Sequence, residues 1–92
     1  LAYAARKYES ITIADTAIGL TTANITAYTS RVYCTLETGQ IRFRTEGTNP
    51  TSASGHLLEV GSALELYSYD DIVKFKAIRT GATSGVLNCS YW

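Results

Sequence analysis

The sequence is poor in the residues that most catalytic and nucleic-acid-binding sites require. It has one histidine, one proline, no methionine and no net charge, with eight basic residues balancing eight acidic ones. Proteins that bind nucleic acid usually carry a basic excess, because release of counterions from the phosphates drives their affinity. We therefore expect no nucleic-acid partner. The apolar runs are far shorter than the ~20 residues of a membrane-spanning helix, so we expect no membrane contact either.

Catalytic motifs are also missing. His56, the only histidine, stands between a glycine and a leucine, which offer it no acid, base or ligand as a partner. The sequence contains no nucleophile elbow, phosphate-binding loop or HExxH pattern. Asp70 and Asp71, with Glu65, supply the oxygen ligands that calcium takes, but no calcium-loop pattern accompanies them, so we interpret them as solvated turn residues. We expect no enzyme, no cofactor and no metal site.

The two cysteines, Cys34 and Cys89, leave a question of redox state open. Each falls on the apolar phase of an alternating run, so we favour two buried free thiols that act as small hydrophobic side chains. A disulfide between them is the alternative, and it would indicate an oxidising compartment. Their spacing fits no zinc-binding or CxxC pattern.

Short runs in which apolar and polar residues alternate follow one another along the chain, which indicates strands rather than helices. These runs cover residues 8–14, 31–37, 40–45, 56–60, 63–67, 72–79 and 85–92. The glycine at Thr38-Gly39 predicts a hairpin there, and residues 80–85 predict a second one. In the run 72–79 we expect Val73, Phe75 and Ala77 to point inward.

No helical period persists beyond a turn or two. We therefore predict an all-β fold, a small antiparallel β-sandwich of about seven short strands. It forms one domain, residues 8–92, preceded by an N-terminal arm, residues 1–7. With 92 residues, 46% of them hydrophobic, the core is packed but thin, so contacts with partners would add stability.

Exposed aromatic and basic residues are the main candidates for binding. Tyrosines 28, 33, 67 and 69 fall on outward phases or in loops, which suits a protein interface, a sugar-stacking platform, or simply packing at the rim of the sandwich. Arg42, Arg44, Lys74 and Lys76 also take outward phases and would line one face if their strands are neighbours. We favour a solvated, salt-bridged face for these four charges.

Several motifs in the second half of the chain resemble a group of small structural proteins of tailed phages and prophages. The motifs are residues 41–44 (IRFR), 46–51 (EGTNPT), 55–58 (GHLL) and 75–83 (FKAIRTGAT), followed by a closing strand. Glu46 stands where that group's pattern has aspartate. Members of the group look like β-sandwich virion components, so the resemblance implies a role on or in the phage particle.

Composition and resemblance together predict a non-enzymatic virion structural protein that decorates or cements the capsid. We expect it to be a homo-oligomer, with a trimer as the first guess, bound to the major capsid protein or other virion proteins. The alternatives are a head–tail or tail-associated adaptor, and a carbohydrate-binding module on a phage or bacterial surface. The residues predicted to make the contacts lie in the arm, in the long loop and at a tyrosine corner: Leu1, Tyr3, Arg6, Lys7, Thr48, Asn49, Pro50, His56, Tyr67 and Tyr69.

Overall fold

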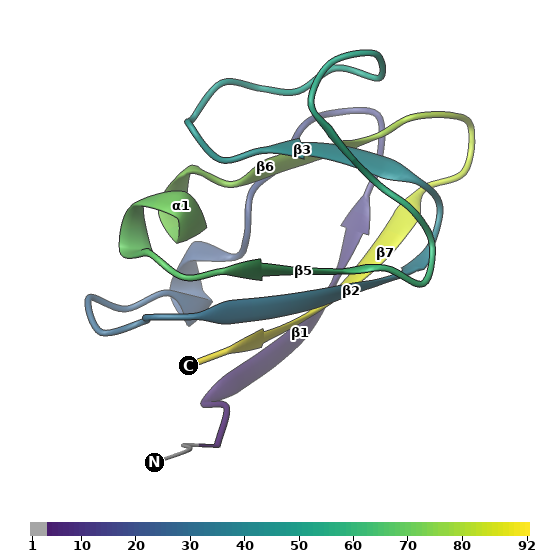
Figure 1. Ribbon diagram of the computed structural model, residues 1–92. Coiled ribbons are helices and arrows are strands. Elements are labelled where there is room, and N and C mark those ends of the chain that lie inside the picture. The colour runs from purple at the N-terminus through teal and green to yellow at the C-terminus, as the bar shows by residue number, and fades with distance from the viewer. Residues whose placement is uncertain (1–3) are drawn as a thin grey trace.

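The computed structural model describes residues 4–92 as two antiparallel β-sheets packed face to face (Figure 1). Sheet A has the order β1-β7-β2-β5 and contains β1 (Lys7–Ile13), β7 (Gly85–Tyr91), β2 (Val32–Thr38) and β5 (Ala63–Leu66). Sheet B has the order β4-β3-β6 and contains β4 (His56–Leu58), β3 (Ile41–Arg44) and β6 (Lys76–Arg79). This architecture confirms the predicted all-β antiparallel sandwich of seven short strands.

The core fills the space between the two sheets, and the alternation of the sequence predicts much of it. Every second residue is buried from Val32 to Leu36 in β2 and throughout β7, and in both strands the cysteine is one of them. From sheet B, Ile41 and Ala77 are fully buried opposite these strands. Phe43, partly buried, packs against this core and stacks on Phe75, with the ring centroids 5.7 Å apart.

One segment predicted as a strand begins instead as a helix. Residues 69–74 form α1 (Tyr69–Lys74), and β6 covers only the second half of the predicted run 72–79. The side chain of Ser68 accepts a hydrogen bond from the backbone N–H of Asp71 at 3.1 Å, which caps the helix. As a result Ile72 is buried and Val73 is 42% exposed, so the inward position predicted for Val73 was wrong. Phe75 and Ala77 are buried as predicted.

Both predicted hairpins are also wrong, because the strands that flank them belong to different sheets. The chain leaves sheet A after Thr38 and enters sheet B at Ile41, and it returns from sheet B to sheet A between Arg79 and Gly85. In a hairpin the two strands would pair with each other. Here β2 and β7 pair in one layer while β3 and β6 pair in the other (Figure 1).

The two connections between the sheets, residues 39–40 and 80–84, pack against each other, and we call them the between-sheet corners. The backbone N–H of Thr80 donates to the carbonyl of Gln40 at 3.2 Å, and the hydroxyl of Thr80 donates to the same oxygen. Gly39 has a φ of +67°, and a Cβ atom on it would lie 2.5 Å from the carbonyl oxygen of Ser84. Only glycine fits both the left-handed backbone and this close approach.

Candidate interaction surface

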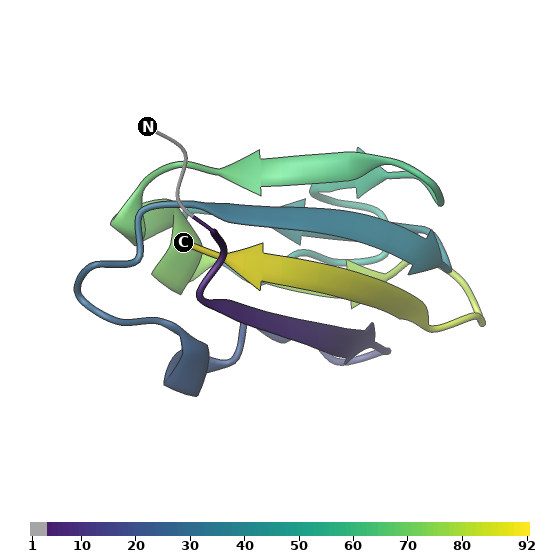
Figure 2. The same ribbon diagram turned by 90° about the horizontal axis from the view of Figure 1, so that it is seen from below.

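Sheet A turns one face of its four strands outward (Figure 2), and the register of the strands arranges the side chains of that face in rows. The register sets Tyr8 of β1 opposite Ser90 of β7, Ser90 opposite Tyr33 of β2, and Tyr33 opposite Glu65 of β5. Side chains of antiparallel neighbours directly opposite each other project from the same face of the sheet. Tyr8 is 65% and Tyr33 36% exposed, so this first row places two tyrosines on the molecular surface.

A second row lies two residues away along each strand, towards the end of the sandwich where β1 begins and β7 ends. It contains Trp92, Arg31 and Tyr67, which follow β7, precede β2 and follow β5 on the same outward phase as the first row. Arg31 links the two rows, because its guanidinium binds Glu65 at 3.0 Å and lies 4.4 Å from the centroid of the Trp92 ring. A guanidinium over an indole face is a favourable cation–π contact.

Tyr67 belongs to the same network. Its hydrogen bond to Glu65 raises the pKa of the phenol, since ionisation would place two negative oxygens side by side. The side chain is 69% exposed. Glu65 therefore pairs with Arg31 and interacts with Tyr67 on the same face. We call the two rows together the aromatic face: Tyr8, Arg31, Tyr33, Glu65, Tyr67, Ser90 and Trp92.

The remainder of this sheet surface differs in character from the aromatic face. The third row consists of Ser10, Asn88, Thr35 and Ala63, which are small or polar. Among residues 7–92, no helix or loop crosses the outer face of sheet A, whereas residues 4–6 run across the end of the sheet beside the C-terminal end of β7 (Figure 2). The large side chains are thus gathered at the end of the sheet next to this N-terminal segment.

The predicted contact residues divide between this face and other parts of the molecule. Arg6 is exposed and immediately precedes β1, and its backbone N–H donates to the carbonyl of Tyr91 at 2.7 Å. Lys7 is already the first residue of β1, so the arm ends one residue earlier than predicted. Leu1 and Tyr3 lie outside the described residues. Tyr67 belongs to the face, whereas Tyr69 begins α1 and lines a small pocket beside it with Leu20, Thr22, Ile25 and Val73.

The long loop, residues 45–55, lies on the other side of the sandwich, against the outer face of sheet B. Arg42 holds it there, because its guanidinium donates to the carbonyls of Ser52 at 3.1 Å and Gly55 at 2.9 Å. Thr48 and Asn49 are exposed, whereas Pro50 is buried. His56 is exposed, with its ring 5.4 Å from that of Phe43.

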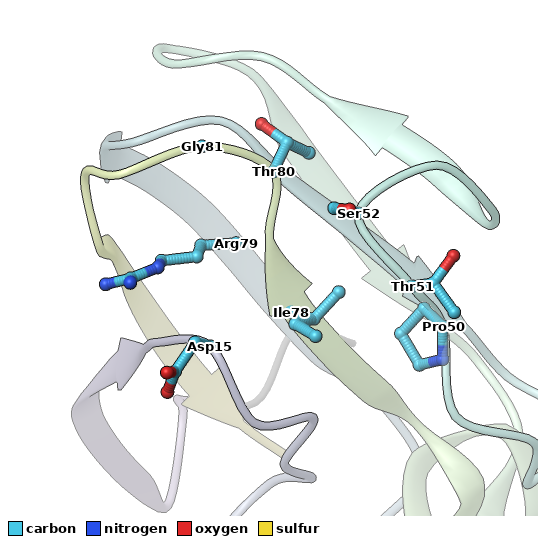
Figure 3. A pocket seen from close by; sticks show the side chains of 8 residues that line it. All are labelled: Asp15, Pro50, Thr51, Ser52, Ile78, Arg79, Thr80 and Gly81. Atoms are coloured by element: carbon cyan, nitrogen blue, oxygen red, sulfur yellow. The ribbon is translucent and has the colours of Figure 1, made fainter.

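An open pocket of about 460 Å³ lies where this loop meets β6 (Figure 3). Pro50, Thr51 and Ser52 form one side of it, across from Ile78, while Arg79 extends towards Asp15 on the other side of the strand (Figure 3). Arg79 donates to the hydroxyl of Ser84 at 3.2 Å, so its charge is directed away from the loop. The lining contains one acidic residue, Asp15, and no histidine, cysteine or lysine.

The predicted row of four basic side chains does not form. Arg44 and Lys76 are opposite each other on β3 and β6, but Lys74 is in α1 and Arg42 is engaged by the loop. Glu46 binds Arg44, with the Nε–Oε1 distance at 2.9 Å. This ion pair agrees with the solvated, salt-bridged face that we favoured.

Residues 4–92 contain no group of three or more histidine, cysteine or acidic side chains that is placed to hold a metal ion. No helix in the same residues is long and apolar enough to cross a bilayer. Asp70 and Asp71 lie in the first turn of α1, and Glu65 binds Arg31, so the three acids considered as calcium ligands do not form a cluster.

Sequence reasoning missed four members of the aromatic face: Tyr8, Arg31, Ser90 and Trp92. Their outward phase was readable from the alternation of β1, β2 and β7, but their proximity depends on β7 lying between β1 and β2. That strand order has no local signal in the sequence. Comparison with known protein families, curated proteins and solved structures finds no match to this chain.

Proposed function

We propose that this protein is a non-enzymatic structural component of a tailed-phage particle, which binds the capsid through the aromatic face. The observation that carries the proposal is the two-row cluster on the outer face of sheet A, combined with the resemblance of the sequence to phage structural proteins. Tyrosine, tryptophan and arginine are the residues most enriched at the energetically important centres of protein interfaces. The aromatic face consists largely of these three types.

Charge favours an acidic patch on the capsid protein as the partner surface. Arg31 on the aromatic face and the exposed Arg6 just before β1 carry two positive charges, whereas Glu65 carries one negative charge that Arg31 already pairs. Opposite potentials on two surfaces speed their encounter and fix their relative orientation. A thin domain also gains stability from such contacts, because binding to the native state alone shifts the folding equilibrium towards it. Oligomerisation, with a trimer as the first expectation, would multiply the contacts on a repeating lattice.

The test compares two exposed side chains on opposite sheets. Tyr33→Ala removes the centre of the aromatic face, and Leu57→Ala removes a 46% exposed side chain from the outer face of sheet B as the matched control. Each variant is mixed with empty capsids of the encoding phage, and bound protein is measured by co-sedimentation. A residue at the centre of an interface contributes about 2 kcal/mol or more, so Tyr33→Ala should weaken binding about thirtyfold or more. Leu57→Ala should bind like the wild type.

Three results would contradict capsid binding through this face. One is equal binding by wild type and Tyr33→Ala, and another is loss of binding only in Leu57→Ala. The third is failure of the wild type to bind capsids at all. Binding to purified tails in that case would favour the adaptor role.

A carbohydrate-binding role is the second candidate, because Tyr8 and Tyr33 present exposed rings in one row of a flat sheet. Stacking of sugar rings on such a platform would give selective binding on a glycan array. That binding would be lost in Tyr33→Ala and kept in Leu57→Ala. A capsid-binding protein should show no preference among glycans.

A further inference from the structure

The two cysteines meet in the centre of the sandwich. Cys34 of β2 is directly opposite Cys89 of β7, and both side chains are fully buried. The two sulfur atoms are 3.1 Å apart, with the thiol of Cys34 donating to that of Cys89. A disulfide requires about 2.05 Å between the sulfur atoms, so a movement of about 1 Å would join them.

The backbone at this position has the geometry that a cross-strand disulfide needs. The N–H of Trp92 donates to the carbonyl of Arg31, which makes that pair a hydrogen-bonded one. Hydrogen-bonded and non-hydrogen-bonded pairs alternate along antiparallel strands, so Cys34 and Cys89, three positions further on, form a non-hydrogen-bonded pair. The Cα atoms of such pairs are about 4.5 Å apart and their side chains approach closely, within the range that disulfides span.

We propose that Cys34 and Cys89 are a disulfide site whose oxidation state is fixed when the chain folds. In the presence of a small-molecule disulfide, the thiolate of one cysteine attacks that disulfide and releases one small thiol. The second cysteine then attacks the mixed disulfide and releases the other. One S–S bond breaks in the oxidant and one forms in the chain, and two electrons and two protons pass to the two small thiols.

Because both cysteines are buried in the folded protein, they react with oxidants and reductants mainly while the chain is folding. In the folded state neither sulfur atom is accessible to an oxidant or a reductant. The hydrogen bond with Cys34, together with burial, raises the pKa of the Cys89 thiol far above its ordinary value, so Cys89 provides almost no reactive thiolate. Exchange therefore takes place while the chain is open, and the sandwich then encloses whichever state it has formed.

The first experiment refolds the wild-type protein from urea with oxidised and reduced glutathione. Samples are quenched with acid, denatured, alkylated, and analysed by mass spectrometry. We expect a monomer with neither cysteine alkylated and no bound glutathione. Cys34→Ala is the control, and its single thiol should form only a mixed disulfide. Two free thiols in the refolded wild type, or a bond only between chains, would overturn the proposal.

The second experiment tests enclosure on the wild type alone, so it does not depend on whether a variant folds. The oxidised protein is treated with dithiothreitol, and the reduced protein with oxidised glutathione, each with and without urea. In both directions the folded protein should react at least about a hundredfold more slowly than the unfolded chain, because only transiently opened molecules exchange. Equal rates would refute enclosure. Neither experiment involves a capsid, so its outcome is independent of the proposed partner.

Discussion

Substituting Gly39 by alanine tests whether the two between-sheet corners are stacked. In Gly39→Ala the new Cβ atom would lie 2.5 Å from the carbonyl oxygen of Ser84 and 2.8 Å from the backbone nitrogen of Gly85. Both are main-chain atoms, so they move only if the corner itself shifts. Gly61 is the matched control, since it also has a positive φ, +86°, but an added Cβ atom there would meet nothing within 4 Å.

The expected cost is built up from two contributions. Alanine in the left-handed region costs about 1–2 kcal/mol, partly offset because alanine restricts the unfolded chain by about 0.4–1 kcal/mol. Gly61→Ala should therefore lower the free energy of unfolding by about 1 kcal/mol. Gly39→Ala adds the clash, and overpacking of this kind typically costs about 1–3 kcal/mol. The total of about 3 kcal/mol is a large part of the roughly 5–14 kcal/mol expected for a domain of this size.

Equilibrium urea unfolding measures both variants, with the fluorescence of Trp92, the only tryptophan, as the probe and circular dichroism as a check. If Gly39→Ala loses no more stability than Gly61→Ala, the corner at residues 38–40 does not lie against residues 84–85. The description of β2 and β3 as strands of different sheets would then have to be abandoned. If Thr38-Gly39 formed a hairpin instead, the added methyl group would lie in solvent, and Gly39→Ala and Gly61→Ala would lose the same free energy of unfolding.

Two further predictions concern stability. Ile72→Ala should lower the free energy of unfolding by about 2–5 kcal/mol, because Ile72 is fully buried in α1. Val73→Ala should change it by no more than about 0.5 kcal/mol. If urea denaturation showed the larger loss in Val73→Ala, residues 72–79 would have to be described as a strand, as the sequence predicted. Partial burial would raise the pKa of Glu9, but hydrogen bonds from Thr21 and Tyr91 outweigh it and hold the pKa below its ordinary value of 4.5. This stabilisation is complete above pH 4.5 and is lost as the pH falls through the lower pKa of the folded state. Urea midpoints measured from pH 6 to pH 2 should therefore fall less in Glu9→Gln than in the wild type. The control is Glu37→Gln, which replaces an exposed glutamate and should follow the wild type. If the midpoints of all three proteins fell in parallel, the role of Glu9 would be contradicted.

The sequence predicted the fold class because each strand records, in its alternation, which side faces the core. Cys34 and Cys89 were placed on the buried phase for this reason, and so were Phe75 and Ala77. The same alternation cannot distinguish a hairpin from a crossing between sheets, since both read as strand, turn and strand. The crossing depends on contacts between residues 38–40 and 80–85, which are distant in the sequence.

The errors at α1 and at the aromatic face have different physical causes. At α1, the side chain of Ser68 caps the helix by accepting a hydrogen bond from the backbone N–H of Asp71. A helix of six residues is too short for a helical repeat of apolar residues to be recognised in the sequence. At the aromatic face, outward phase was predictable for Tyr33 and Tyr67, but the contact of Arg31 with Trp92 is a property of strand order. Local patterns identify which side chains point outward, and long-range pairing decides which of them meet.

The position of β7 has a consequence for synthesis on the ribosome. This strand comes last of the seven in the chain, yet it lies between β1 and β2 in sheet A. While the nascent chain is still emerging, β1 and β2 have no neighbour on the sides that β7 will occupy, and their unpaired backbone groups are open to other chains. Such long-range pairing also folds slowly. A premature stop before Gly85 would leave β1 unpaired in sheet A and give an aggregation-prone product rather than a shorter sandwich.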